Sequence, residues 1–388
     1  MDHLLVRYGS PLYVYDADLV RTAYARFVTA FAYRPLDVHY AIVCNKNRYL
    51  VRMLAELGAG IHANTPGDAF AALAAGVSAE RILYSGTNLD AHDFSFLREH
   101  GIRMNLDSLD QLRDVCRIGG VRELGLRLLI DDDDRPNRIG VTLRELSDAL
   151  ALASATGVRL TGLHMYAGTN TRTVQRFVDC LDRLIAASDM LPDLAWIDLG
   201  GGFGLPYSET DRELPLTNLG AAVSERLRRV SDRRGREITL VVEPGRYLVG
   251  AAGSLLTRVV SVKQREGRRY VGVDTTVGNL VVPSVYHTRH RIEVVDHAAS
   301  LGPVLDVPTD VCGNTTHSRD YLARNVRLPA VQPGDVLRLC DVGAYGYAMS
   351  SHFLNRPRPA EVVIDRGAEH LTTRRETFAD LLATHLQS

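Results

Sequence analysis

An alternation of short apolar runs with amphipathic segments fills the first two-thirds of this 388-residue chain and strongly constrains its fold. The apolar runs are rich in β-branched and aromatic residues, which is typical of strands. Helical patterns lie between them and end at glycines, as helices commonly do. The clearest strand-like runs are Val38–Val43, Arg81–Tyr84, Leu160–Met165, Trp196–Leu199 and Thr239–Glu243. Roughly eight such strand–helix units before residue 246 predict a (β/α)₈ TIM barrel.

The pattern changes after Arg246, where short strand-like runs follow one another with turn sequences between them. Gln332-Pro333-Gly334 is one such turn. This texture predicts a β domain. The extended segment Leu12–Tyr15 is a candidate to join it. We therefore predict a barrel domain at 13–246, and a β-sandwich or β-barrel domain formed by 1–12 and 247–388.

Charge and cysteine usage exclude several classes of protein. The 45 basic and 46 acidic residues nearly balance, and no basic block points to nucleic acid or to a membrane surface. The five cysteines are scattered without a C-x-x-C pair, which argues against a disulfide framework and fits a reducing compartment. No signal-peptide pattern and no apolar run of membrane-spanning length is present. We expect a cytoplasmic protein.

Lysine is almost absent from the chain. Only Lys46 and Lys263 are lysines among the 45 basic residues, and all the others are arginine. Any mechanism that needs a side-chain amine therefore has few residues available to it.

Two motifs at predicted strand ends carry possible chemistry. In the first, Gly200, Gly201 and Gly202 follow a strand, and a loop with so few side chains lets backbone N–H groups converge on a phosphate. The alternative is a tight strand-to-helix turn. In the second, Glu243 and Arg246 place a carboxylate and a guanidinium at another strand end, the face on which barrel active sites lie. The alternative is a structural ion pair at a domain junction.

The pairing of Leu-Gly-Gly-Gly-Phe with Glu-Pro-Gly-Arg at this spacing resembles the fold-type-III decarboxylases, which depend on pyridoxal 5'-phosphate (PLP) and include diaminopimelate and ornithine decarboxylase. Further matching segments are PLYVYD at Pro11–Asp16, LAELGAG at Leu54–Gly60, NLDSLDQL at Asn105–Leu112, RIGV at Arg138–Val141 and DVGAYGYAMSSHFLNRPRPAEV at Asp341–Val362. The resemblance implies an alanine-racemase-like barrel with a β domain, a carbon–carbon lyase activity, PLP as cofactor, and a homodimer with shared active sites.

The resemblance also implies roles for individual residues. Gly200–Gly202 would hold the cofactor phosphate through backbone N–H groups, and Glu243 would pair with the protonated pyridine nitrogen. Arg246 would lie near the phosphate and the substrate carboxylate. Tyr345 would reach the phosphate of the partner subunit's site.

One position departs from the family pattern at its chemical centre. The lysine that forms the Schiff base lies in a motif of the form Y-A-[VIL]-K-[AC]-N, and here Val43 stands in its place. Valine has no amine and cannot shuttle a proton. Lys46 lies three residues further along the chain and is a candidate to fold back over the site. The alternative for Lys46 is an exposed loop lysine.

Other departures fall at chemical positions too. Tyr166 stands where a histidine stacks on the cofactor ring, and an aromatic ring can still stack there. In the C-E-S-x-D loop, Thr316 replaces the proton-donating cysteine and His317 replaces the acidic residue, while Asp320 is kept. His62 stands where an acidic residue is common. The catalytic candidates are Tyr166, Thr316, His317 and Lys46, and the substrate-binding candidates are His62 and Asp320.

Three functional interpretations follow. In the first, which we favour, the chain is an amino-acid or amine decarboxylase of specialised metabolism, with PLP or a related phosphate bound non-covalently or through Lys46. In the second, the barrel is a PLP-independent enzyme. A metal among His62, His164, His317 and Asp320 is conceivable there, but no H-x-x-x-H pair supports it, so we expect no metal. In the third, the chain is a non-catalytic partner subunit or ligand sensor.

Overall fold

The computed structural model describes residues 1–129, 138–208, 210–295 and 303–386. The chain divides into two compact units. The barrel domain consists of residues 21–205 and 213–247, and the β domain consists of residues 1–20, 206–212 and 248–388. Each domain is described by itself.

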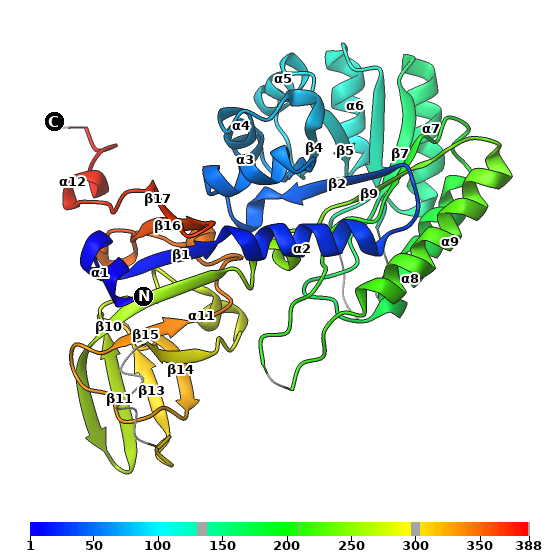
Figure 1. Cartoon of the computed structure of the whole chain (residues 1–388). Helices are drawn as coiled ribbons and strands as arrows, with labels where there is room; N and C mark the ends of the chain where they lie inside the picture. The colour runs from blue at the N-terminus through cyan, green and yellow to red at the C-terminus, as the bar shows by residue number, and fades with distance from the viewer. Residues whose placement is uncertain (130–137, 209, 296–302, 387–388) are drawn as a thin grey trace. The chain divides into compact units, whose positions relative to one another are not determined.

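Within the described residues of the barrel domain, eight parallel strands close into a barrel (Figure 1). The ring closes because Leu36 of the first strand pairs with Leu240 of the last. The strands are β2 (Leu36–Ala41), β3 (Gly60–Ala63), β4 (Ile82–Ser85), β5 (Arg103–Leu106), β6 (Glu123–Arg127), β7 (Arg159–His164), β8 (Trp196–Asp198) and β9 (Thr239–Val242). The predicted TIM barrel with a separate β domain is confirmed.

Helices alternate with the barrel strands, and the five helices α3 to α7 begin at side-chain caps. Thr142 and Glu145 form a reciprocal capping box at the start of one helix, and Gly157 ends the same helix with a left-handed backbone. The helices are α2 (Ala17–Ala30), α3 (Arg48–Glu56), α4 (Pro66–Ala74), α5 (Ala91–Glu99), α6 (Leu109–Ile118), α7 (Leu143–Thr156), α8 (Val174–Ser188), α9 (Leu216–Arg234) and α10 (Arg246–Val249). No helix among the described residues is long and apolar enough to cross a membrane.

The inside of the barrel is packed around Trp196. A Cβ on Gly125 of β6 or Gly162 of β7 would lie 2.1 or 2.0 Å from its indole ring, so both strands need glycine at those positions. Trp196 also packs against Leu83 and Val241 in a buried cluster. Close packing of this kind fixes the strands, and therefore fixes the side chains at their ends.

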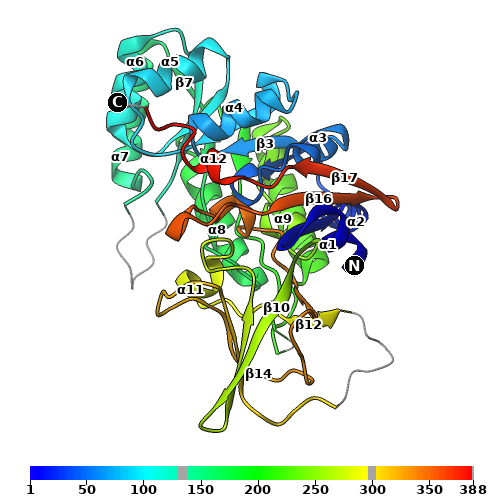
Figure 2. The same cartoon turned by 90° about the vertical axis from the view of Figure 1, so that its left-hand side faces the viewer.

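The β domain is built on one sheet in the order β14-β13-β11-β10-β1-β16-β17, with β15 joining β10 to β12 (Figure 2). Its strands are β1 (Leu12–Asp16), β10 (Gly253–Arg265), β11 (Arg268–Val273), β12 (Ile292–Val295), β13 (Thr309–Cys312), β14 (Tyr321–Val326), β15 (Val336–Leu339), β16 (Ala360–Asp365) and β17 (Ala368–Thr373). Its helices are α1 (Asp2–Tyr8), α11 (Val282–Tyr286) and α12 (Phe378–Leu381). Leu4, Leu5 and Val362 contribute to its buried core.

The N-terminal domain boundary differs from the one predicted. Strand β1 pairs antiparallel with β10 and parallel with β16, so its backbone is part of the β-domain sheet. The β domain therefore extends through Val20 instead of ending at residue 12, and it also includes residues 206–212. The predicted barrel range of 13–246 begins too early, because the pairing of β1 with β10 and β16 places residues 13–16 in the β domain. The suggestion that Leu12–Tyr15 joins the β domain agrees with this pairing.

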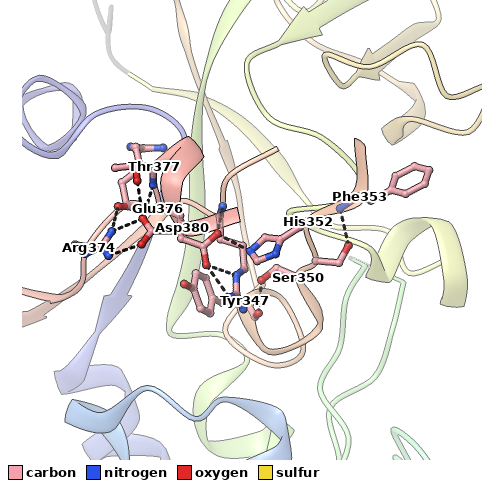
Figure 3. Close-up of polar contacts among 11 residues, drawn as sticks. Tyr347, Ser350, His352, Phe353, Arg374, Glu376, Thr377 and Asp380 are labelled. Atoms are coloured by element: carbon pink, nitrogen blue, oxygen red, sulfur yellow. Dashed lines mark hydrogen bonds and ion pairs between the residues drawn. The ribbon is translucent and has the colours of Figure 1, made fainter. Parts of the chain in front are cut away.

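A polar network ties together two segments near the C-terminus (Figure 3). The Glu376 carboxylate accepts hydrogen bonds from the Arg358 backbone N–H at 2.9 Å and from its Nε at 2.8 Å. His352 Nε2 lies 2.7 Å from the same carboxylate. These contacts hold the pKa of Glu376 below its ordinary value despite burial. Glu376 is therefore the centre of a charge-assisted cluster in the β domain.

Candidate active site

Polar side chains converge where the barrel strands end. Arg127, His164 and Asp198 are the last residues of β6, β7 and β8, and the register places each beside the next. Glu243 directly follows β9, and His62 is the second-last residue of β3. Active sites of (β/α)₈ barrels lie at this carboxyl end of the strands. We call His62, His164, Asp198 and Glu243 the strand-end cluster.

The strand-end cluster is almost completely buried, and its distances are short. His62 Nε2 lies 3.2 Å from Glu243 Oε1, and His164 Nε2 lies 3.5 Å from Glu243 Oε2. Asp198 accepts hydrogen bonds from Gly200 N–H at 2.9 Å and from Asn105 Nδ2 at 3.2 Å. Among the described residues, Glu243 Oε1 and the ring nitrogens of His62 and His164 have no aligned hydrogen-bond partner. Such buried polar atoms are costly unless a ligand completes them.

Burial sets the protonation of the strand-end cluster. It raises the pKa of Glu243 to about 7, and burial together with the neighbouring Glu243 charge raises the pKa of Asp198 to about 7. Burial also lowers the pKa of His164 to about 4 and the pKa of His62 well below its usual value. At neutral pH the histidines are therefore neutral, and the two carboxyl groups share protons as a coupled pair.

The loop Gly200–Gly202 after β8 needs glycine at each position. Gly200 and Gly202 have φ of +68° and +92°, and a Cβ on them would lie 2.1 Å from Met165 O and Gly168 O respectively. A Cβ on Gly201 would lie 2.7 Å from Glu243 O. In the described part of the chain the N–H groups of Gly201 and Gly202 donate to no acceptor. This loop therefore offers backbone donors to an anion beside Glu243.

Tyr166 borders the glycine loop. A Cβ on Gly202 would lie 3.4 Å from its ring, and its hydroxyl lies 2.9 Å from Thr169 Oγ1. The Arg127 guanidinium lies 5.7 Å from the ring centroid. The phenol is partly exposed, and burial of the remainder raises its pKa. The positive charge of Arg246 acts on the same phenol and opposes that shift.

The sequence pattern of the family described as "Pyridoxal-dependent decarboxylase, pyridoxal binding domain" matches residues 17–250, which is more than half of the chain. This chain belongs to the pyridoxal-dependent decarboxylase family. The expectation of a decarboxylase-like enzyme with PLP as cofactor is thereby confirmed at the level of the family.

Known relatives extend this likeness to the whole chain. A diaminopimelate decarboxylase from Methanothermobacter thermautotrophicus is 33% identical, with 97% of this chain and 91% of the relative covered. A diaminopimelate decarboxylase from Pseudomonas fluorescens is also 33% identical, covering 97% and 93%. The structure of diaminopimelate decarboxylase from Helicobacter pylori complexed with L-lysine matches with a TM-score of 0.90 at 26% identity, covering 98% of each chain.

Val43, the residue expected from the sequence resemblance at the lysine position, lies in the short 3₁₀ helix Ile42–Cys44 after β2. Its side chain is 38% exposed. Lys46 is also exposed. Its positive charge acts to lower the pKa of Asp68, which lies in the first turn of α4. This placement favours a loop lysine for Lys46. Its catalytic role stays a prediction.

The remaining candidates lie in the β domain. Thr316 and His317 are exposed, and the His317 ring makes an edge contact with Phe353 at 5.3 Å. Asp320 is buried, and it accepts hydrogen bonds from Val277 N–H at 2.7 Å and from the Thr315 N–H at 3.0 Å. Both carboxylate oxygens of Asp320 therefore accept backbone hydrogen bonds, which favours a structural role over the predicted substrate contact.

Tyr345 also belongs to the β domain, and its backbone is left-handed with φ +63°.

The four residues considered from sequence as metal ligands come from both domains. His62 and His164 belong to the barrel domain, whereas His317 and Asp320 belong to the β domain. His164, Asp198 and Glu243 do bring one ligand atom each within 4.8 Å of one another, but both Asp198 oxygens already accept hydrogen bonds.

Sequence reasoning missed Arg127 and Asp198 and gave His164 only a minor place. All three are the last residues of their strands, which is the signal that could have found them, since barrels place functional groups there. Arg127 acts on Glu243, Asp107 and Asp198 through its charge. It therefore supplies a positive charge to the carboxyl pair.

The residues present fit a non-covalently held PLP. Glu243 Oε1 is buried without a donor, the glycine loop presents N–H groups, and the Tyr166 ring borders that loop. These features suit the pyridine nitrogen, the phosphate and the ring face respectively. A covalent link at residue 43 does not fit, because valine has no amine.

Proposed function

We propose that this chain is a PLP-dependent amino-acid decarboxylase of the diaminopimelate and ornithine decarboxylase type that holds its cofactor without a covalent lysine link. The observation that carries the proposal is the buried Glu243 Oε1 beside the glycine loop, which accepts no aligned hydrogen bond from the described residues, combined with valine at position 43. The names of the relatives support decarboxylation and an amino-acid substrate.

When bound, PLP supplies an aldehyde that reacts with an amine and a ring that withdraws the electron pair released by loss of CO₂. The chain's own part is to bind and to control protons. Gly201 and Gly202 bind the phosphate through their N–H groups. Glu243 Oε1 would accept a hydrogen bond from the pyridine nitrogen, and the buried His62 lies 3.2 Å from the same oxygen.

Val43 cannot hold or move a proton, so another side chain has to supply this function. Tyr166 is the candidate in the barrel domain. Because its pKa is raised, its hydroxyl is protonated at neutral pH, so it acts as a proton donor and not as a base. The contact between its oxygen and Thr169 Oγ1 orients the hydroxyl.

The proposal includes a homodimer in which Thr316, His317 and Tyr345 of one subunit complete the site of the other. The exposure of Thr316 and His317 on the β domain and the resemblance of the loop Thr316–Asp320 to an element shared across the family's dimers support this arrangement. Light scattering after size-exclusion chromatography tests it. A dimer is expected, and a monomer that is active would contradict it.

Release of CO₂ from amino acids tests the function itself. The purified protein is incubated with PLP and, in separate reactions, with meso-diaminopimelate, L-lysine and L-ornithine. Turnover that depends on added PLP and is lost in Glu243→Ala supports the proposal. Binding of PLP without CO₂ release from any of these would favour the ligand-sensor interpretation, and turnover without PLP would favour a PLP-independent enzyme.

A further inference from the structure

A hollow of about 780 Å³ lies within the β domain, between the end of α11 and strand β14. Its basic lining residues are His287, Arg289, His290, Arg319 and Arg324, and none of its lining residues is Asp or Glu. Hollows of this size are typical of small-molecule sites. Its lining residues belong to the β domain, whereas the strand-end cluster consists of barrel residues.

The three arginines of this hollow have no carboxylate partner among the residues that the structure describes. Arg289, Arg319 and Arg324 form no ion pair within 4.0 Å, although Arg291 beside the hollow pairs with Glu293. Five other arginines of the β domain are paired with acidic residues: Arg258–Asp2, Arg268–Asp310, Arg338–Glu293, Arg358–Glu376 and Arg374–Asp380. Arg269 and Arg375, which also lack a carboxylate partner among the described residues, donate instead to backbone carbonyls. Positive charge is therefore gathered in the hollow without an ion-pair partner among the described residues of the β domain.

Another hollow shows the opposite arrangement. The one between α8 and α9, of about 470 Å³, is lined by Asp182 and Glu225 together with several arginines. There Arg226 pairs with Asp182 and Arg229 pairs with Glu225. A basic hollow without acidic residues is thus not a general result of the high arginine content.

One guanidinium in the hollow is already held in place. The Arg324 guanidinium carbon lies 3.7 Å from the centroid of the Tyr321 ring, a stacking contact that fixes its plane. A fixed planar guanidinium is suited to two parallel hydrogen bonds with a phosphate or carboxylate. We propose that this hollow binds a small polyanion carrying phosphate or carboxylate groups, held by Arg289, Arg319 and Arg324.

Arg319 belongs to the loop Thr316–Asp320 of the proposed dimer site, whereas Arg289 and Arg324 lie outside that loop. The proposal is tested on the full chain by anomalous diffraction from crystals soaked in selenate, and in solution by calorimetric titration with pyrophosphate and with citrate. The expected results are an anomalous peak among the three arginines and solution binding that weakens about tenfold or more in Arg324→Ser, the loss of one charge-assisted contact. Stronger binding of pyrophosphate than of citrate would identify phosphate as the preferred group, and the reverse would identify carboxylate.

The matched control is Arg52→Ser, because Arg52 lines a separate hollow that contains Glu56. This variant should bind both anions as the unmodified protein does. Selenate at Gly200–Gly202 is distinguished by its position in the barrel. No peak in the β-domain hollow, a peak without binding in solution, or equal binding by Arg324→Ser and the unmodified protein would each overturn the proposal.

Discussion

His62 Nε2 lies 3.2 Å from Oε1 of Glu243, and both side chains are buried where the barrel strands end. An acidic residue at position 62, which the sequence resemblance leads us to expect, would place a second negative charge beside this carboxylate. A neutral imidazole removes that repulsion and leaves Glu243 able to face a cationic ring nitrogen. The substitution at residue 62 is therefore compatible with the cofactor role of Glu243.

Replacing Glu243 with glutamine should stabilise the cofactor-free protein at high pH. The folded pKa of Glu243 is raised to about 7, so its buried carboxylate imposes no penalty below its unfolded pKa and the full penalty above about 7. The variant should gain on the order of 1–3 kcal/mol in the free energy of unfolding at about pH 8, and almost nothing at about pH 4. Urea denaturation at the two pH values measures the difference.

The control for this prediction is Glu56→Gln, because Glu56 is an exposed carboxylate at the end of α3. Its free energy of unfolding should follow that of the unmodified protein at both pH values. An equal gain at both pH values for Glu243→Gln would show that the raised pKa is not the cause.

Gly202→Ala should weaken both the fold and the binding of PLP. Its φ of +92° disfavours a side chain, and the new Cβ would lie 2.1 Å from Gly168 O, a backbone atom that cannot move away easily. Gly157→Ala has a comparable φ of +75° but open space around the Cβ. Gly157→Ala should cost about 1 kcal/mol from backbone strain alone. Gly202→Ala should cost clearly more, and should lower PLP affinity about tenfold or more.

Thermal unfolding and PLP titration of these two variants separate strain from contact. Unchanged PLP affinity in a folded Gly202→Ala protein would remove the glycine loop from the cofactor site.

Tyr166→Phe should distinguish the contribution of the aromatic ring to PLP binding from that of the hydroxyl to proton donation. The ring is kept, so PLP affinity should stay within about threefold of the unmodified value. The proton donor is lost, so CO₂ release should fall about 100-fold or more. Tyr166→Ala should lose affinity as well. Tyr24→Phe in α2 serves as the control and should change neither quantity, and full turnover by Tyr166→Phe would exclude this hydroxyl as the proton donor.

Glu376→Gln should destabilise the β domain. The variant keeps the shape of the side chain but removes the charge that holds Arg358 and His352 (Figure 3). A loss of about 1–3 kcal/mol is expected at neutral pH for such charge-assisted contacts. The pKa of Glu376 is lowered in the fold, so its contribution is present above the unfolded pKa and disappears as the pH falls through the lower folded value.

Chemical denaturation across the acid range measures this effect. Glu237→Gln, at an exposed position, is the control and should unfold as the unmodified protein does at every pH. Equal stability of Glu376→Gln and the control at neutral pH would contradict the assigned role.

The repeated pattern of strands and helices was enough to predict the barrel, but two of its strands escaped detection. β3 and β5 are four residues long and contain His62 and Asn105, so neither shows the run of β-branched residues that marks a strand. His62 was singled out through the family resemblance, whereas its contact with Glu243 depends on which strand ends meet in space. Pairings between distant strands are not encoded in local patterns.

The same limit applies to the domain boundary and to Asp320. The run Leu12–Asp16 looks like any other strand, and only its pairing with β10 and β16 assigns it to the β domain. Asp320 matches the family's acidic position in sequence, but its hydrogen bonds with Val277 and Thr315 become visible only when the loop is folded. Sequence motifs indicated which residues matter, and the fold shows what each one contacts.

Titration of the purified protein with PLP tests the central claim most directly. Absorbance follows the binding, borohydride reduction fixes any covalent adduct, and peptide mass spectrometry locates it, with Val43→Lys as the positive control. The account predicts saturable binding that dialysis reverses, no fixed cofactor on the unmodified chain, and cofactor fixed at residue 43 in the variant. Cofactor fixed on Lys46 of the unmodified chain, or no binding of PLP at all, would contradict it.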